Sequence, residues 1–421
     1  MVINIANFNF GGDGGGSGKP ALLQEKTATI VQNGSQTITP DEGFDGMSSV
    51  QINAAITGDS SAIDFSSIGY DAELSAELNA NMNDDIAYSK TLYDAWNPSN
   101  TSAYLLYSGD TRLVYAPKID TRNVTRADNM FNSCINLKVV PKYNTSNVED
   151  MAQMFIGCSS LVSVEKFDTS KVGNMFNMFA GCNSLNTVPD FDTSSARNMT
   201  SMFSRCSSLT TVPLFDTSKV TDMRSMFSNC SGLTSVPLFD TSEVTDMSYM
   251  FYNCSGLTTV PSFNVIKVTT FQSMFSGCNS ITTIPELNTI NVKNFAWMFE
   301  DCDKLTTIEG ISFKSFSDST MDMYYLFSYS SNSSIRKAVF KDIGYNSSTK
   351  KFDMSNIKNW GVNTSEIPYA RQSLIDSLIT YSFDRASAGY PTCEITLSTN
   401  TKALLTEDEK AQIEAKGFTI A

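Results

Sequence analysis

The chain of 421 residues contains no histidine, although it holds nine cysteines and nineteen methionines. Histidine is the usual general base at neutral pH and the commonest metal ligand. Its absence excludes Ser-His-Asp and Cys-His catalytic sites and every zinc site that uses imidazole. Carboxylate pairs such as Asp84-Asp85 remain, but neighbours in sequence on a helix diverge rather than face one cleft. We therefore expect a protein that is not an enzyme and needs no cofactor.

Positive charge is also scarce, since 30 Lys and Arg stand against 44 Asp and Glu, for a net charge of −14. A nucleic-acid interface needs a basic face, and an anionic membrane surface attracts one. No apolar run is long enough to span a membrane. The opening MVINIANFNFGG lacks the basic and apolar regions of a secretory signal. We expect no nucleic acid, no membrane insertion and folding in a cytoplasm.

The cysteines that are present form a regular column with a spacing of 24 residues. Each follows a Met-Phe pair after two intervening residues, as in Met130-Phe131. A register held without insertion predicts a solenoid of stacked units. The cysteines of this structural ladder are Cys134, Cys158, Cys182, Cys206, Cys230, Cys254, Cys278 and Cys302.

One repeat, residues 220–243, combines two patterns. Val220, Met223, Phe227 and Cys230 have the spacing of an amphipathic helix. The stretch 233–236 is typical of a short strand. We therefore predict the α/β class, namely a leucine-rich-repeat solenoid of 24-residue helix–strand units. Strands at ~4.8 Å and helices at ~10 Å would bend the array into a curve.

The cysteine column has a chemical and a structural interpretation. A disulfide needs Cα atoms about 4.4–6.8 Å apart. Cysteines on neighbouring helices would lie nearer ~10 Å apart. Zinc sites favour close pairs such as C-x2-C, which the column lacks. We interpret the cysteines as buried, unpaired, small apolar side chains.

A second column carries carboxylates and amides one repeat apart. A stack of carboxylates is able to bind calcium. Three of its eight positions are asparagine, however, and each residue precedes a turn that it can cap. We favour capping and expect no metal. The column consists of Asp120, Asn144, Asp168, Asp192, Asp216, Asp240, Asn264 and Asn288.

Two slots of the repeat vary from unit to unit, and they predict where a ligand binds. One precedes the second phenylalanine column, and the other precedes the Met-Phe pair. Exposed charged and aromatic side chains on a repeat scaffold suit contacts with sugars or proteins. The candidate ligand-contact residues are Lys142, Lys166 and Asp190 in the first slot, Tyr249 and Trp297 in the second, and Tyr252, which by the same helical phase also points away from the core.

The flanks differ from the repeats in composition. A glycine-rich tether follows the alternating N-terminal peptide, and Asn33-Gly34 predicts a hairpin turn. Residues 72–96 have helical spacing. The domains predicted are 1–20, a peptide and tether; 21–58, a small β attachment unit; 59–112, a helical connector and cap; 113–326, the repeats; and 327–421, an α+β C-terminal cap.

The C-terminal cap contains several separate signals. We predict a helix over 369–379 and a strand over 393–397. Thr406 and Glu409 form a capping box, which begins a helix that Gly417 ends. A last strand follows over 418–420.

The units FDTSKVTDMRSMFSNC (215–230) and FDTSEVTDMSYMFYNC (239–254) resemble the BspA-type leucine-rich repeat of bacterial surface proteins. The resemblance covers residues 113–326 and implies binding rather than catalysis. Residues 86–96, 27–56 and 397–406 look like segments of virion proteins of Bacteroides phages, of the crAss-like kind.

Together these resemblances imply a phage virion surface protein, a fibre or decoration subunit, that is made without a signal peptide. Residues 1–58 would attach to other virion proteins, and the repeats would bind a host-surface glycan or protein. A homo-oligomer is left open. The alternatives are a bacterial cell-surface adhesin and a purely architectural virion subunit, with a carbohydrate-active enzyme least favoured.

Overall fold

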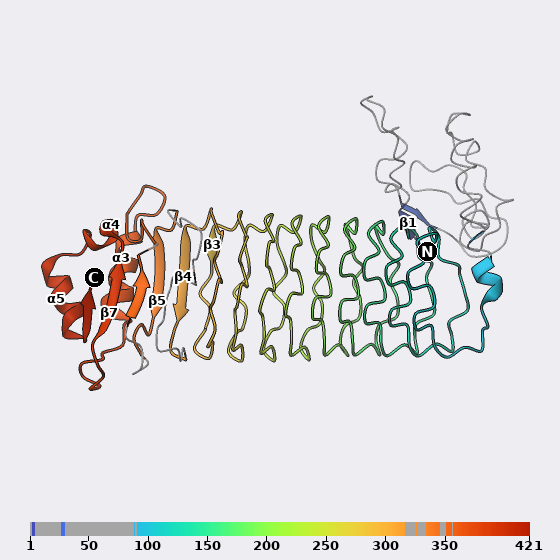
Figure 1. Cartoon of the computed structure of the whole chain (residues 1–421), viewed down its shortest axis with the longest axis horizontal. Coiled ribbons are helices and arrows are strands. Elements are labelled where there is room, and N and C mark those ends of the chain that lie inside the picture. Colours follow the sequence, from blue (N-terminus) through green and yellow to red (C-terminus); the bar gives the residue numbers. More distant parts are fainter. Residues whose placement is uncertain are drawn as a thin grey trace, which may run out of the picture.

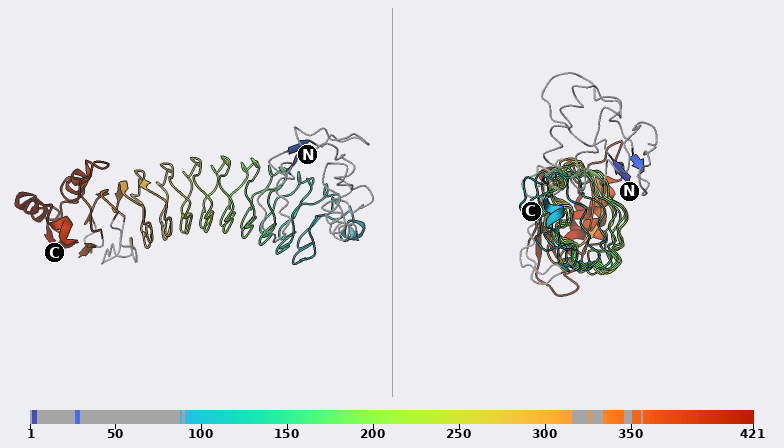
Figure 2. Two further views of the ribbon diagram at one scale, coloured as in Figure 1. Left: turned by 90° about the horizontal axis from the view of Figure 1, so that it is seen from above. Right: turned by 90° about the vertical axis from the view of Figure 1, so that its right-hand side faces the viewer.

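The structure, a computed structural model, describes residues 2–4, 27–29, 88, 91–315, 326, 334–345, 351–355 and 357–421. Figure 1 shows coils of similar size stacked along one nearly straight axis, with α3, α4 and α5 gathered at the C-terminal end. Figure 2 gives the same array from above and from one end. The molecule is a repeat protein whose two three-stranded sheets are small and parallel.

Regular strands occur mainly towards the C-terminal end. Two three-stranded parallel sheets follow one another, and a separate antiparallel pair lies near the N-terminus. The first sheet consists of β3 (Thr283–Ile284), β4 (Thr307–Ser312) and β5 (Lys337–Lys341). The second consists of β6 (Lys351–Met354), β7 (Cys393–Leu397) and β8 (Phe418–Ile420). The antiparallel pair is β1 (Val2–Asn4) with β2 (Thr27–Thr29).

Each 24-residue coil forms its backbone hydrogen bonds in two directions. The N–H groups of Ser225 and Phe227 donate to the next coil, to the carbonyls of Ser248 at 2.9 Å and Met250 at 3.0 Å. The N–H of Met226, between them, donates back to Met223 within its own turn at 3.2 Å. Along this segment, every second N–H group thus bonds to the next coil, and the N–H between them closes a turn within its own coil. Neighbouring coils therefore supply hydrogen-bond partners that the buried backbone groups require.

The coils stack closely because no helix separates them. Along the column from Phe131 to Phe299, neighbouring ring centroids lie 5.4 to 6.0 Å apart. The second column is similar, with Phe215 and Phe239 6.4 Å apart. A helix layer would need about 10 Å between units.

The core runs along the array as rows of similar buried side chains, one from each coil. In the coil that begins at Val220, the side chains of Met223, Met226, Phe227 and Cys230 are all fully buried. Thr217 is buried too, and its hydroxyl donates to the carbonyl of Asp240 in the next coil at 2.7 Å. Since each coil closes one side of its neighbour's core, the hydrophobic burial of every coil depends on the coils beside it.

The predicted helix over the Val220 segment is wrong, because the structure has a series of tight turns there. Ser225 and Asn229 adopt positive φ angles of 57° and 61°, which an α-helix does not contain. The predicted strand over 233–236 is also absent as a regular strand, and its equivalent first appears as β3. The predicted curve is not seen either, since the coils in Figure 1 stack along a nearly straight axis.

The stacking begins N-terminal to residue 113. Ser102 forms a parallel bridge with Arg126, and Tyr107 stacks on Phe131 with centroids 5.4 Å apart. Residues 91–95 are helical, and the indole N–H of Trp96 donates to the carbonyl of Asp120 at 2.8 Å. The rest of the predicted connector helix and most of the predicted β attachment unit lie outside the described residues.

The part of the chain from β6 onward, which we call the C-terminal unit, contains true helices. They are α3 (Ala370–Ile375), the π-helical turn η5 (Asp376–Thr380), α4 (Thr399–Lys402) and α5 (Glu407–Ala415). The predicted strands 393–397 and 418–420 are confirmed as β7 and β8. The capping box of Thr406 and Glu409 is confirmed at the start of α5, and Gly417 follows its end with a φ of 88°.

Candidate binding surface

Two positions in each coil between Leu105 and Asp301 hold a left-handed backbone, and one of them carries the aromatic candidates. At this position most coils have small or amide side chains, which tolerate a positive φ. Tyr249 and Trp297 occupy it with φ angles of 59° and 57°. The other residues with a positive φ in this slot are Leu105, Asn129, Gln153, Asn177, Ser201, Ser225 and Ser273. Tyr249 and Trp297 thus adopt a backbone conformation that is unfavourable for large side chains.

Tyr249 belongs to a small polar and aromatic cluster on the face of the array. Its ring meets that of Tyr252 edge to face, with the centroids 5.8 Å apart. Its hydroxyl accepts a hydrogen bond from the amide of Gln272 at 2.8 Å, and that amide's oxygen accepts one from Asn294 at 3.4 Å. Both tyrosines are half-buried. The cluster offers ring faces beside amide donors and acceptors, the pairing that sugar hydroxyls and C–H groups use.

Trp297 lies two coils beyond Tyr249 in the same slot, with Ser273 between them. Trp297 is half-buried, whereas Ser273 is only 4% exposed. The corresponding serines at 201 and 225 are more exposed, although Ser225 also has Tyr249 beside it in the slot. Ser273 thus has a large aromatic residue in both adjacent coils and is the most buried of these three serines.

The charged candidates belong to a second row, which we call the ridge. The ridge is the exposed residue before the second phenylalanine column in each coil, and it contains Lys142, Lys166, Asp190, Leu214, Leu238, Ser262 and Glu286. Lys166 and Asp190 form a loose ion pair at 3.8 Å. Glu286 pairs with Lys341, which comes from β5. Exposed pairs of this kind contribute little to stability.

Two leucines lie at the middle of the ridge, and the sequence analysis did not include them among the candidate ligand-contact residues. Leu214 is 63% exposed and Leu238 is 59% exposed. Single exposed leucines are ordinary, but two in adjacent coils form a contiguous apolar patch. The observable signal was the repeated VPLFDTS segment, which places a leucine in the ridge twice in succession.

The structure does not bring the charged and the aromatic candidates together. Lys142, Lys166 and Asp190 belong to coils nearer the N-terminal end than the coil with Tyr249 and Tyr252. The two groups also occupy different slots of the repeat, and no hydrogen bond or ion pair between them is found among the described residues. A single ligand of small size would meet one group or the other.

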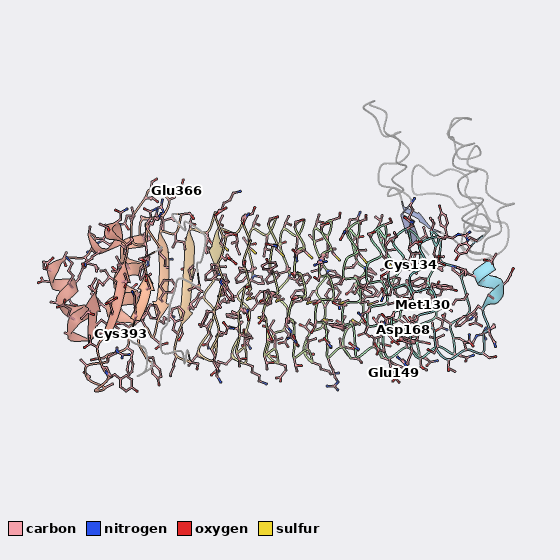
Figure 3. All side chains as sticks on the ribbon, in the orientation of Figure 1. Met130, Cys134, Glu149, Asp168, Glu366 and Cys393 are labelled. Atoms are coloured by element: carbon pink, nitrogen blue, oxygen red, sulfur yellow. The ribbon has the colours of Figure 1, made fainter. Side chains whose placement is uncertain are left out.

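The cysteine column is structural. All eight thiols are buried and unpaired, and each donates to a phenylalanine or tyrosine carbonyl of the preceding coil. Cys230 does so to Phe203 at 3.0 Å. Burial raises the pKa of the Cys230 thiol to about 12, so at neutral pH this thiol stays protonated. Figure 3 shows Met130 and Cys134 within the array and Glu149 at its edge.

The aspartate column has the predicted turn role. Asp216 accepts hydrogen bonds from both the N–H and the hydroxyl of Ser218, at 3.0 and 2.7 Å. The hydroxyl bond is the main cause that lowers the pKa of this carboxyl. A further column of turn-forming residues, which includes Asp222 and Asp246, escaped the sequence analysis. Among the described residues no cluster of three or more potential metal ligands is found, and none of the helices is long and apolar enough to cross a membrane.

These features define a class, a repeat protein of stacked 24-residue units with a continuous core. The repeats match the family described as "Mycoplasma protein of unknown function, DUF285", over residues 114–212, 159–257, 210–313 and 231–338. The matched region covers more than half of the 421 residues, and the chain belongs to this family. The match supports the resemblance to BspA-like repeats and does not test the resemblance of the flanks to phage proteins. No curated protein matches the chain.

Proposed function

We propose that this chain is a non-enzymatic surface protein whose repeats bind a glycan or protein on a host surface. In this proposal the array is a solenoid of the BspA-like leucine-rich-repeat kind, built from turns in place of helices. The observation that carries it is the presence of Tyr249 and Trp297 at left-handed positions. A bulky residue there costs about 1–3 kcal/mol of backbone strain, and such costs gather at ligand sites.

The chemistry around Tyr249 favours a glycan over other host ligands. Tyrosine and tryptophan rings pack on the C–H faces of sugars, and neighbouring amides bind their hydroxyls. The Gln272 amide, held by the Tyr249 hydroxyl, supplies such a group beside the rings. The overall charge of −14 also favours a neutral ligand over an acidic one.

The location proposed is the surface of a phage virion, as a fibre or decoration subunit. Its support is the resemblance of the flanking segments to virion proteins, and residues 1–58 would make the attachment. A bacterial surface adhesin and an architectural virion subunit are the alternatives. Mass spectrometry of purified virions distinguishes a virion protein from a bacterial adhesin. Detection of the protein only on bacterial envelopes would overturn the phage location.

The binding proposal is tested with the double variant Tyr249→Asn/Trp297→Asn of the full chain. Asparagine occupies this slot at positions 129 and 177, so the variant keeps a suitable left-handed residue and its melting temperature should be unchanged or higher. We expect binding to host cells and to a host-glycan array to fall at least tenfold. The matched control is Ser225→Asn, which changes the same slot without removing a ring. Equal binding by all three proteins would exclude the aromatic surface as the ligand site.

A further inference from the structure

The ridge has an apolar centre that protrudes from the array. Leu214 and Leu238 stand in two coils with the same Val-Pro-Leu-Phe-Asp-Thr-Ser segment. The N–H of Phe239 donates to the carbonyl of Pro237 at 3.0 Å, which closes a three-residue turn with Leu238 at its apex. Since the Phe239 side chain is buried in the core, the preceding leucine points outward. The two leucines therefore form the most prominent apolar point of the ridge.

The flanks of this centre carry opposite charges at matching distances. Two coils before Leu214 stands Lys166, and two coils after Leu238 stands Glu286. Their side chains are 59% and 64% exposed, so each has room for a further partner. Asp190 and Ser262 fill the intervening positions, and both are exposed.

We propose that the ridge is a self-complementary surface on which a second copy of this chain docks in the antiparallel direction. A two-fold axis that crosses the ridge midway between the leucines places each slot opposite its counterpart in the second copy. Leu214 then faces Leu238, Asp190 faces Ser262, and Lys166 faces Glu286. Every contact occurs twice, as in any isologous interface. The apolar pair lies at the centre and the charged pairs lie towards the rim, which is the usual arrangement of protein interfaces.

Charge selects this direction over the parallel one. In a parallel pair each lysine of the ridge would meet its own copy, Lys166 against Lys166, and Glu286 would meet Glu286. Like charges placed opposite each other suppress association, whereas the antiparallel direction turns both contacts into attractions. Lys341, which already contacts Glu286, would complete a Lys–Glu–Lys group with the incoming Lys166.

Neighbouring charge and the narrow shape of the ridge limit how tightly two copies associate. Asp216 and Asp240 lie two residues beyond the leucines, and the two-fold axis brings like carboxylates near each other. Each is hydrogen-bonded within its own coil, to Ser218 and Ser242. A single row of side chains also buries less than the ~800 Å² per partner of a standard interface. A reversible dimer with a dissociation constant on the order of micromolar is therefore expected.

The test is the oligomeric state of the full chain by sedimentation velocity over a range of concentrations up to about 100 µM, which brackets a micromolar dissociation constant. We expect a monomer–dimer equilibrium that the double change Leu214→Ser/Leu238→Ser weakens at least tenfold. Serine occupies the same slot at Ser262, so the fold should tolerate the change. A chain that stays monomeric throughout, or a dimer that the serine variant leaves unchanged, overturns the proposal.

Charge variants test the pairing. Lys166→Glu should weaken the dimer, because it places two acidic groups opposite each other, and Lys166→Glu/Glu286→Lys should restore it. Lys142→Glu is the matched control, since Lys142 faces Gly310, which has no side chain to pair with. Equal weakening by Lys142→Glu and Lys166→Glu would reduce the effect to net charge and overturn the register.

Direction is tested by cross-linking with a short bis-maleimide. The double variant Asp190→Cys/Ser262→Cys should form covalent dimers, while Asp190→Cys alone and Ser262→Cys alone should not. The nine native thiols are buried and unpaired, so they do not compete for the reagent in the folded chain. Cross-linking by either single variant to the same extent would indicate the parallel arrangement and contradict the proposal.

Discussion

The repeat coils and the C-terminal unit bury similar side chains on two different backbones. In the coils the N–H of Phe227 donates to Met250 of the next coil, so neighbouring coils satisfy each other. In the C-terminal unit α5 keeps its hydrogen bonds inside one helix and begins at a capping box. The coil depends on its neighbours for backbone partners, whereas the helix needs neighbours only for its apolar face.

This difference sets the spacing and the thiol chemistry of the two regions. Coils without helices stack with ring centroids 5.4 to 6.0 Å apart, so eight cysteines lie in one close, buried column. The C-terminal unit holds a single buried cysteine, Cys393, at the start of β7. The two regions should therefore respond differently to conditions that ionise thiols or that disturb hydrogen bonds between coils.

The largest contrast is expected at alkaline pH. Burial raises the pKa of Cys230 to about 12 from an ordinary value of 9.0, so the folded thiol stays protonated where the unfolded one ionises. The stability this gives is complete below about pH 9 and is lost as the pH rises towards 12. Within that pH window, each such thiol lowers the free energy of unfolding by about 1.4 kcal/mol per pH unit, and the array holds eight of them.

Hydrogen exchange measured separately for the array and for residues 357–421 between pH 7 and pH 11 checks this contrast. The array should lose protection first, because one thiol acts on the C-terminal unit and eight act on the array. Cys254→Ala is the control, and it should lower the pH slope of the unfolding free energy by about 1.4 kcal/mol per unit. An array that keeps its stability to pH 11 would contradict the buried thiol column.

A smaller effect, confined to one region at a time, is expected from truncating a ring in each. Phe227 stacks between Phe203 and Phe251 with the ring centroids 5.8 Å apart, and Phe418 is a buried residue of β8 in the second sheet. Phe227→Ala and Phe418→Ala should each remove about 3–5 kcal/mol of stability. Because each coil interacts mainly with its neighbours, Phe227→Ala should increase hydrogen exchange in the coils near the change and leave residues 357–421 protected from exchange. Uniform loss of protection over the chain with both variants would show one cooperative unit instead.

The two regions also differ in how far their sequence predicted them. Thr406 and Glu409 identified α5 because a capping box is a local signal, independent of what packs nearby. In the coils, Met223, Phe227 and Cys230 have spacings that a helix and a series of turns bury equally well. The neglected signal was the second left-handed column, which is rich in residues that tolerate a positive φ. It contains Gly109, Ser133, Gly157, Gly181, Arg205, Asn229, Asn253, Gly277 and Asp301.

The candidate binding surface was likewise predictable from the sequence only in part. The slots of Tyr249 and Tyr252 follow from the register alone, so their place outside the core was predictable. The bond from Gln272 to the Tyr249 hydroxyl was not, because it depends on the spacing between coils. The cysteines were correctly predicted to be unpaired, although the coils lack the helical spacing of ~10 Å from which that prediction followed.

Glycine and alanine substitutions distinguish the two backbones more finely. Asn229 has a φ of 61°, so Asn229→Gly should keep or raise stability and Asn229→Ala should lower it by about 1 kcal/mol. Gln412 is an exposed residue within α5, where Gln412→Gly should cost about 1 kcal/mol and Gln412→Ala should be neutral or better. Urea denaturation of the four variants measures whether glycine is favoured over alanine at position 229 and alanine over glycine at position 412. The same order of alanine and glycine at both sites would mean that the coils are helical after all.

The smallest effect is expected at the turns, where the coils use side chains in a way that resembles helix capping. Asp216→Asn should be nearly neutral because Asn264 holds the equivalent turn, while Asp216→Ala should lose about 1 kcal/mol with its hydrogen bonds. The Ser218 hydroxyl lowers the pKa of Asp216, so the wild-type contribution is present above the ordinary carboxyl pKa of 3.8 and fades as the pH falls. The difference in unfolding free energy between the wild type and Asp216→Asn, followed from pH 6 to pH 2.5, should shift in favour of the asparagine variant in acid. A difference that stays constant with pH would mean that the carboxylate charge adds nothing to the turn beyond its oxygen.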